Sequence, residues 1–206
     1  MVFFFTLRSN PNVICYMGRD KHENEELIRW GWPEDWWFHV DSLSSAHVYV
    51  RLPYGASMDE LTEEMIEECC QLVKANSIQG CKLNNVRIVY TPWANLKKTG
   101  DMDVGQVGYH DDKKQRFFTV AKKNNAMINA LEKTRVEKDL DFRAEREERD
   151  RRVNAIEREK ARKEAEEERE REAERKRIAD QKAYKGLHDQ DMEPNVGDVP
   201  DEDDFM

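Results

Sequence analysis

Two neighbouring strand-like segments, Trp36–Val40 and Ala46–Leu52, carry an unusual set of side chains on one of their two faces. Side chains alternate between the faces of a strand, so each face can be described separately. One face is uniformly apolar and is expected to be core; it holds Trp36, Phe38, Val40, Ala46, Val48, Val50 and Leu52. The second face has flat rings and one guanidinium group but no aliphatic side chain; it holds Trp37, His39, His47, Tyr49 and Arg51.

The chemistry of this second face favours nucleic acid. Rings and an arginine exposed on a sheet can stack unpaired bases, at about 1–3 kcal/mol per base. Together with the basic residues described next, the pattern predicts that the two strands turn a wet, ring-rich surface outward. In the alternative interpretation a helix covers this face, and the two histidines are hydrogen-bonded in the interior.

Basic residues concentrate in the middle of the chain, although its 206 residues carry a net charge of −9. Residues 74–133 contain 11 basic and 5 acidic side chains, whereas residues 1–73 and 189–206 each carry a net charge of −8. Screening confines each patch to surroundings of roughly 8–10 Å, so an acidic average does not exclude phosphate binding. Taken singly, each lysine is better explained as solvated surface. Together they could neutralise a phosphate backbone: Lys74, Lys82, Arg87, Lys97, Lys98, Lys113, Lys114, Lys122 and Lys123.

An enzymatic interpretation is weaker. Asp35, His39 and His47 could form an acid–base or metal cluster, with Cys81 as a nucleophile, but no further carboxylate or glycine-rich phosphate loop lies nearby. The remaining cysteines, Cys15, Cys69 and Cys70, lack zinc-site spacing and are expected to be reduced thiols. We therefore expect no catalysis, no cofactor and no metal.

The elements that position these residues indicate an α+β fold. We expect a hairpin from Val2–Leu7 and Val13–Met17, a helix over Asn24–Trp30, and further strands over Val86–Tyr90 and Phe117–Val120. A capping box that begins at Ser57 predicts a helix over 58–76. A mixed or antiparallel sheet packed with helices is expected to form one domain over residues 1–123.

The remainder of the chain is highly charged. An unbroken helix is predicted from Asn124 to Tyr184, within a segment 124–186 that is rich in acid-before-base pairs four residues apart. Its apolar seam is sparse, so both a single solvated helix and a weak dimeric coiled coil stay open. The acidic segment 187–206 is expected to be disordered. No apolar run is long enough to span a bilayer, and no signal peptide is evident, so an intracellular chain is expected.

Several motifs occur together in a distinctive order. They are Gly18-Arg19-Asp20 followed by Asn24-Glu25, Asp35-Trp36-Trp37-Phe38-His39, Ser45-Ala46-His47-Val48, and the stretch from Val89 to Lys98. In this combination residues 1–120 resemble the NFACT-R family, also called the domain of unknown function 814 family.

The resemblance implies a nucleic-acid-binding module related to the one in ribosome-quality-control factors that hold tRNA on the large subunit. Those factors add an NFACT-N domain and helix-hairpin-helix elements, which this sequence lacks, so tRNA recruitment is not carried over. Arg19, Asn24, Asp35, His39 and His47 occupy family-motif positions. We expect Arg19 and Lys74 to suit phosphate, and Trp37 and His39 to suit a base or sugar.

Two functional hypotheses result. The first is a non-catalytic nucleic-acid-binding protein, with RNA favoured over DNA and the ribosome as a possible partner, whose helical segment 124–186 recruits a protein. The second is an adaptor whose helix and acidic tail recruit a signalling partner, while the globular domain senses DNA or only docks. We expect a cytoplasmic location, with nuclear or partner-mediated peripheral membrane association also open. The residues expected to contact nucleic acid are Arg19, Asn24, Trp37, His39, His47, Tyr49, Arg51, Lys74, Lys97 and Lys98.

Overall fold

The computed structural model describes residues 1–57 and 60–190, with side chains up to residue 182. The chain divides into two compact units, Met1–Val153 and the part from Asn154 onward. The first unit contains every strand of the described chain and therefore both faces of the sheet that positions the candidate site residues.

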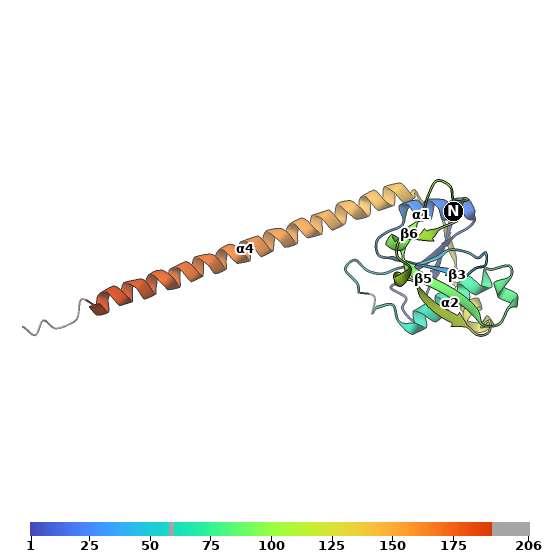
Figure 1. Cartoon of the computed structure of the whole chain (residues 1–206), viewed down its shortest axis with the longest axis horizontal. Helices are drawn as coiled ribbons and strands as arrows, with labels where there is room; N and C mark the ends of the chain where they lie inside the picture. The colour runs from blue at the N-terminus through green and yellow to red at the C-terminus, as the bar shows by residue number, and fades with distance from the viewer. Residues whose placement is uncertain (58–59, 191–206) are drawn as a thin grey trace, which may run out of the picture. The chain divides into compact units, whose positions relative to one another are not determined.

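An antiparallel sheet of seven strands forms the centre of the first unit (Figure 1). Its order is β8-β5-β3-β4-β2-β1-β9, and each neighbouring pair is antiparallel. The strands are β1 (Val2–Thr6), β2 (Ile14–Gly18), β3 (Asp35–Val40), β4 (Val48–Arg51), β5 (Val86–Pro92), β8 (Arg116–Val120) and β9 (Val136–Lys138). A separate two-stranded ribbon joins β6 (Leu96–Lys97) to β7 (Gly108–Tyr109). The predicted fold class is confirmed, with the sheet antiparallel rather than mixed.

The predicted pairing of the two central strands is also confirmed. Trp37 of β3 lies opposite Tyr49 of β4, and Phe38 lies opposite Val48. The apolar face expected to be core is buried against α2 (Glu63–Ala75), whose inward stripe includes Met65 and Leu72. This first face and its helix form the larger of two hydrophobic clusters in the unit.

Helix α2 begins later than its capping box predicts. Ser57 and Glu60 do form a turn, in which the Ser57 N–H donates to Glu60 Oε1 at 3.2 Å. Leu61 then inserts into the core, and the helix begins after Thr62, whose hydroxyl accepts from the Met65 N–H at 3.3 Å. Residues 58 and 59 lie outside the described chain.

The unbroken helix predicted from Asn124 is wrong. The chain instead forms α3 (Asn125–Lys133), the strand β9, and then α4 (Phe142–Gln190). Thr134 caps the end of α3, and its hydroxyl also accepts from the Thr6 N–H at 3.0 Å. β9 then pairs with the edge of β1, so tertiary pairing overrides the strong helical pattern of the sequence.

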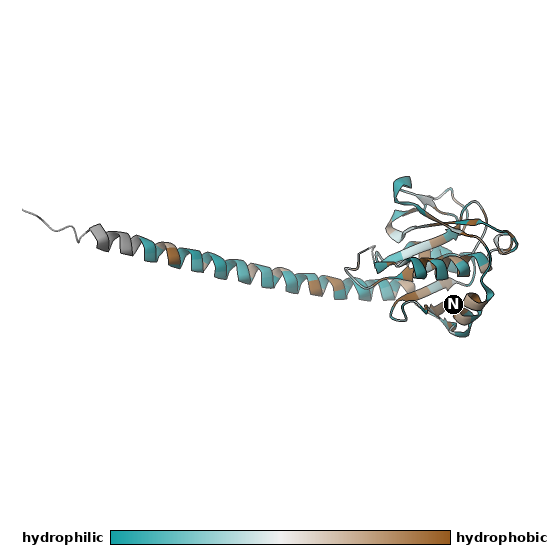
Figure 2. Cartoon of the chain, turned by 90° about the horizontal axis from the view of Figure 1, so that it is seen from below, coloured by the Kyte–Doolittle hydropathy of each residue, from teal (hydrophilic) through white to brown (hydrophobic). Residues whose placement is uncertain are grey.

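Helix α4 forms only part of its predicted charge pattern; Arg149, for example, pairs with Glu34 and Asp150 and not with the acid four residues before it. Of the predicted pairs, Glu159–Lys163 lies at 2.9 Å and Glu167–Arg171 at 3.1 Å. From Asn154 to residue 182 every side chain is exposed, and Figure 2 shows this stretch as mostly hydrophilic. The predicted acidic tail lies outside the described residues from position 191 onward.

Candidate nucleic-acid interface

The ring-rich second face is not the open surface that the sequence predicted. Trp37 is 1% exposed and Tyr49 is 0% exposed. Helix α1 (Lys21–Trp30) and the β6–β7 ribbon lie on this side of the sheet, opposite α2 (Figure 1). The covering apolar side chains come from α1, the ribbon and its flanks, and the start of α4: Leu27, Trp93, Leu96, Val107, Tyr109 and Phe142. The alternative interpretation, a helix over this face, describes these two rings correctly.

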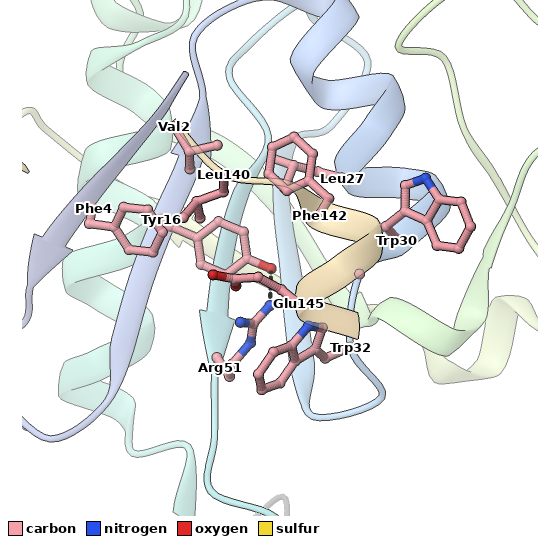
Figure 3. A pocket seen from close by; sticks show the side chains of 11 residues that line it. Val2, Phe4, Tyr16, Leu27, Trp30, Trp32, Arg51, Leu140, Phe142 and Glu145 are labelled. Atoms are coloured by element: carbon pink, nitrogen blue, oxygen red, sulfur yellow. Dashed lines mark hydrogen bonds between the residues drawn. The ribbon is translucent and has the colours of Figure 1, made fainter. Parts of the chain in front are cut away.

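Arg51 serves the fold rather than a ligand. Its Nε donates to Asp35 Oδ1 at 2.8 Å, and its Nη2 donates to the Tyr16 hydroxyl at 3.0 Å. The guanidinium carbon also lies 3.5 Å from the centre of the Trp32 ring (Figure 3). Burial, together with the charge of Asp35, raises the pKa of Tyr16 well above its usual value. The adjoining cavity measures about 20 Å³, which is room for a single water.

Two of the predicted phosphate contacts are also structural. Lys74 is fully buried, its Nζ donates to the Val120 carbonyl at 3.2 Å, and burial lowers its pKa. Lys98 lies 2.8 Å from Glu25, and its Nζ donates to the carbonyls of Asp103 at 2.7 Å and Gln106 at 3.0 Å. Lys98 therefore fixes the 103–106 loop to α1 instead of facing solvent freely.

Two further motif residues lie near the start of α1. Arg19 is exposed, directly before Asp20, whose carboxylate caps the helix. Asn24 is 8% exposed, and its Oδ1 accepts no hydrogen bond within the part of the chain that the structure describes. Of the two, only Arg19 is exposed to solvent.

The structure does bring three of the predicted residues together around one cavity. Trp37 and His39 stack with ring centres 5.3 Å apart, and His39 meets His47 edge to face at 4.9 Å. They line a cavity of about 220 Å³ between the sheet and the β6–β7 ribbon. Its other walls are Val40, Asp41, Ser42, Val89, Gly105, Gln106, Val107 and Tyr109.

Both histidines of this cavity are held neutral. Burial lowers the pKa of His47 to about 3, with smaller contributions from His39 and Lys98. Burial also lowers the pKa of His39. The Trp37 Nε1–H donates to His47 Nδ1 at 3.0 Å, while His39 Nδ1 lies 2.7 Å from the Val40 carbonyl, which can only accept. These two bonds set a different tautomer for each ring.

Beyond the cavity the second face becomes open toward the edge strand β8. His39, Val89 and Phe117 are direct cross-strand neighbours on β3, β5 and β8. Phe117 is 44% exposed, and the Arg87 guanidinium carbon lies 3.7 Å from the centre of its ring. We call His39, Arg87 and Phe117 the β8-side patch. Arg87 also pairs with Asp41 at 3.4 Å, with more than half of its side chain exposed.

The sequence pattern placed Arg87 among the basic residues but did not mark Phe117 as a site residue. The available signal was the strand alternation in Val86–Tyr90, which places Arg87 on the face opposite the buried Ile88. The position of Phe117 beside it depends on the β5–β8 register, which the sequence does not reveal.

Exposed lysines lie on the turn that leads into β8 and on the β6–β7 ribbon. Lys97 is on β6, and Lys113 and Lys114 form the short turn before β8. Asn95 holds that turn, because its Nδ2 donates to the Asp111 carbonyl and its Oδ1 accepts from the Asp111 N–H, both at 2.9 Å. Within residues 1–57 and 60–182 none of the three lysines has an ion-pair partner.

The described part of the chain offers no evidence for two other kinds of site. There, no group of three or more His, Cys, Asp or Glu side chains is arranged to hold a metal ion. Over the same residues, no helix combines the length and the apolar character needed to cross a membrane.

Comparison with known proteins assigns the chain to a family. A family model described as the NFACT protein RNA binding domain matches residues 1–111. The chain belongs to this family. The resemblance inferred from the motifs is thereby confirmed, and family membership supports a nucleic-acid-binding role in general.

Similarity to individual NFACT-family relatives extends over the whole chain. Coiled-coil domain-containing protein 25 of Danio rerio is 56% identical over 208 residues, covering 100% of both chains. The homolog of that protein in Dictyostelium discoideum is 53% identical over 207 residues, again covering 100% of both. The solved C-terminal part of the fibronectin/fibrinogen-binding protein from Streptococcus suis matches with a TM-score of 0.52 at 19% identity, over 62% of this chain and 47% of that one. That last similarity shows a shared fold only.

Proposed function

We propose that this chain is a non-catalytic RNA-binding protein that contacts RNA through the β8-side patch and the lysines beside it. The observation that carries the proposal is an exposed ring stacked with a guanidinium group on the open part of the sheet. Such a pair offers a platform for an unpaired base, and Lys97, Lys113 and Lys114 supply charge for the phosphates. The family description favours RNA over DNA, and structured RNA, including that of the ribosome, is the expected ligand class.

A salt series tests the proposal. Binding of a labelled RNA hairpin is measured by fluorescence anisotropy, and the slope of log K against log salt reports the number of neutralised phosphates. Lys97→Ala is expected to reduce that slope by about 0.7–0.9, the value of one phosphate. Lys133→Ala is the matched control, because Lys133 is exposed on α3, which packs against α2 on the other side of the sheet. Absence of binding at low salt would contradict the proposal.

The exposed stretch of α4 supports a second proposal, in which the helix recruits a partner protein. All side chains from Asn154 to residue 182 are exposed. Ion pairs along this stretch stabilise the helix, although none of its side chains packs into a core. Removal of residues 154–206 should leave RNA affinity intact if the first unit is the RNA-binding part. If removal of this segment abolishes RNA binding, the adaptor hypothesis is favoured. Competition between the RNA and DNA of the same sequence shows which nucleic acid the chain prefers. Sedimentation of the full chain tests the weak homodimer.

A further inference from the structure

We propose that the cavity between Trp37, His39, His47 and the 105–107 loop binds a single unstacked nucleobase of an RNA strand. The inference rests on the proposed RNA-binding function and specifies what the domain does with one base. The RNA interface would then hold one base on the β8-side patch and another base in the cavity beside it.

The two histidines present a fixed donor and a fixed acceptor. His47 Nδ1 accepts from Trp37, so in the neutral ring Nε2 carries the proton and is a donor. His39 Nδ1 donates to the Val40 carbonyl, so its Nε2 is left as an acceptor. The Watson–Crick edge of every base carries an adjacent donor and acceptor, which is the complement of this pair. One donor and one acceptor of this kind suit a base without selecting one base strongly.

The charge of the cavity favours a base over a phosphate. Both imidazoles are neutral, and Asp41 is the one charged residue among the described residues that line the cavity. Its carboxylate pairs with Arg87 at 3.4 Å, so the described lining residues offer a phosphate no unpaired cation. Arg87, Lys97 and Lys98 are nearby cationic side chains, but none of them lines the cavity, and Lys98 is bound to Glu25. A neutral planar ring is thus the ligand that the cavity suits.

The size and walls of the cavity fit one ring system. Its volume of about 220 Å³ is below the roughly 300–1,000 Å³ of pockets that hold drug-sized ligands. Tyr109 contributes an aromatic wall. Ser42, which also lines the cavity, has a φ of 63°, a conformation that is rare for a non-glycine residue and that concentrates at functional sites.

The wall formed by the 105–107 loop is held in place from outside. The Gly105 N–H donates to Glu25 Oε2 at 2.9 Å, and the same carboxylate oxygen lies 2.8 Å from Lys98 Nζ. This link ties the loop to α1, so the cavity is formed before any ligand arrives.

The cavity is adjacent to the β8-side patch. His39 lines the cavity and is separated from Phe117 by one strand, a distance of roughly 10 Å across two strand spacings. One base can therefore stack on Phe117 while a neighbour along the same strand enters the cavity. The phosphates between them would face Arg87 and the lysines.

The direct test uses the indole N–H signal of Trp37 in a ¹H–¹⁵N spectrum of the full chain, assigned with a Trp37→Phe variant. Each of the four nucleoside monophosphates is titrated, with ribose 5-phosphate as the control that lacks a base. The expected result is a shift of this signal with the nucleotides and none with the sugar phosphate. No shift with any nucleotide, or an equal shift with ribose 5-phosphate, overturns the assignment.

A second test separates a base in an RNA strand from a free nucleotide. A short single-stranded RNA is compared with the same RNA carrying an abasic residue at each position in turn. Loss of a base is expected to weaken binding by about 5- to 150-fold at two neighbouring positions, one for the base on Phe117 and one for the base in the cavity. Equal affinity for all abasic strands overturns the proposal, as does a mononucleotide that binds more tightly than the strand.

Variants of His39 distinguish recognition from folding. His39→Leu removes the acceptor and is expected to abolish the abasic effect at the cavity position while leaving the one at the Phe117 position. His39→Gln, which keeps an acceptor at the same distance along the side chain, retains part of the cavity effect. Neither should change the salt slope, which Lys97→Ala does change. Normal salt-dependent RNA binding with no effect of His39→Leu overturns the cavity proposal alone, whereas absence of all RNA binding overturns the proposed function.

Discussion

Lowering the pH should destabilise the globular unit through one histidine. Burial lowers the pKa of His47 to about 3, against about 6.5 for an unperturbed histidine. Since the folded state resists protonation, His47 supports the fold fully above about pH 6.5. That support is lost progressively as the pH falls from 6.5 toward 3. Protonation of Nδ1 would also remove the acceptor that the Trp37 indole uses.

The magnitude is set by the two pKa values. At about pH 5 the folded ring is still unprotonated, whereas the unfolded histidine binds a proton because the pH lies roughly 1.5 units below its pKa. At ~1.36 kcal/mol per unit, the free energy of unfolding should fall by about 2 kcal/mol between pH 7.5 and pH 5 because of His47 alone.

Urea unfolding of the wild type and of His47→Asn at both pH values measures this contribution. Tryptophan fluorescence is a suitable probe, because all five tryptophans lie between residues 30 and 93. Asparagine has an acceptor at the position of Nδ1 but does not titrate. Between pH 7.5 and pH 5, the free energy of unfolding of the variant should therefore fall by about 2 kcal/mol less than that of the wild type.

An exposed histidine provides the control. His110→Asn should keep the full pH dependence of the wild type, since His110 is exposed. If the free energy of unfolding falls equally in the wild type and in His47→Asn between the two pH values, the reasoning is refuted. Titration of the His47 ring by NMR gives an independent check, and a transition above about pH 5 would refute it as well.

Three substitutions should act through other contacts. Phe117→Ala removes the ring beneath Arg87 and is expected to weaken RNA binding by about 5- to 150-fold in anisotropy, with only a small fall in melting temperature because nearly half of the residue is exposed. Arg51→Met leaves the fully buried Asp35 without its ion pair and should reduce the free energy of unfolding by about 3–5 kcal/mol in urea; a loss under about 1 kcal/mol would show that the pair does not stabilise the unit. Gly31→Ala would place a methyl group against the Trp93 indole and should destabilise by about 1–3 kcal/mol, measured in the same way, whereas unchanged stability would mean that the indole moves aside easily.

The core face of the central strands was predictable from alternation alone. Apolar side chains stand at every second position of Trp36–Val40 and Ala46–Leu52, so the face that carries them must turn toward the core. The structure shows that face buried. The motif combination likewise identified the family from residues that are close in sequence. The charge pairs of α4 were predictable because four-residue spacing places side chains together on any helix.

The environment of the second face could not be deduced in this way. Whether Trp37 and Tyr49 are wet depends on α1, the β6–β7 ribbon and the start of α4, which come from distant parts of the chain. The same holds for Lys74, whose charged end reaches the carbonyl of Val120 from another element. A helical charge pattern also failed to predict β9, because pairing with β1 was available only in the folded unit.

By itself, the sequence determined which faces are apolar, where charge accumulates and which family the chain joins, since these depend on residue types at short, regular spacings. Tertiary structure alone decided that the rings of the second face divide between a buried cluster and a cavity, and that Phe117 lies open beside Arg87. Those outcomes depend on strand register and on which distant segment covers which strand, and both are set by packing over the whole unit.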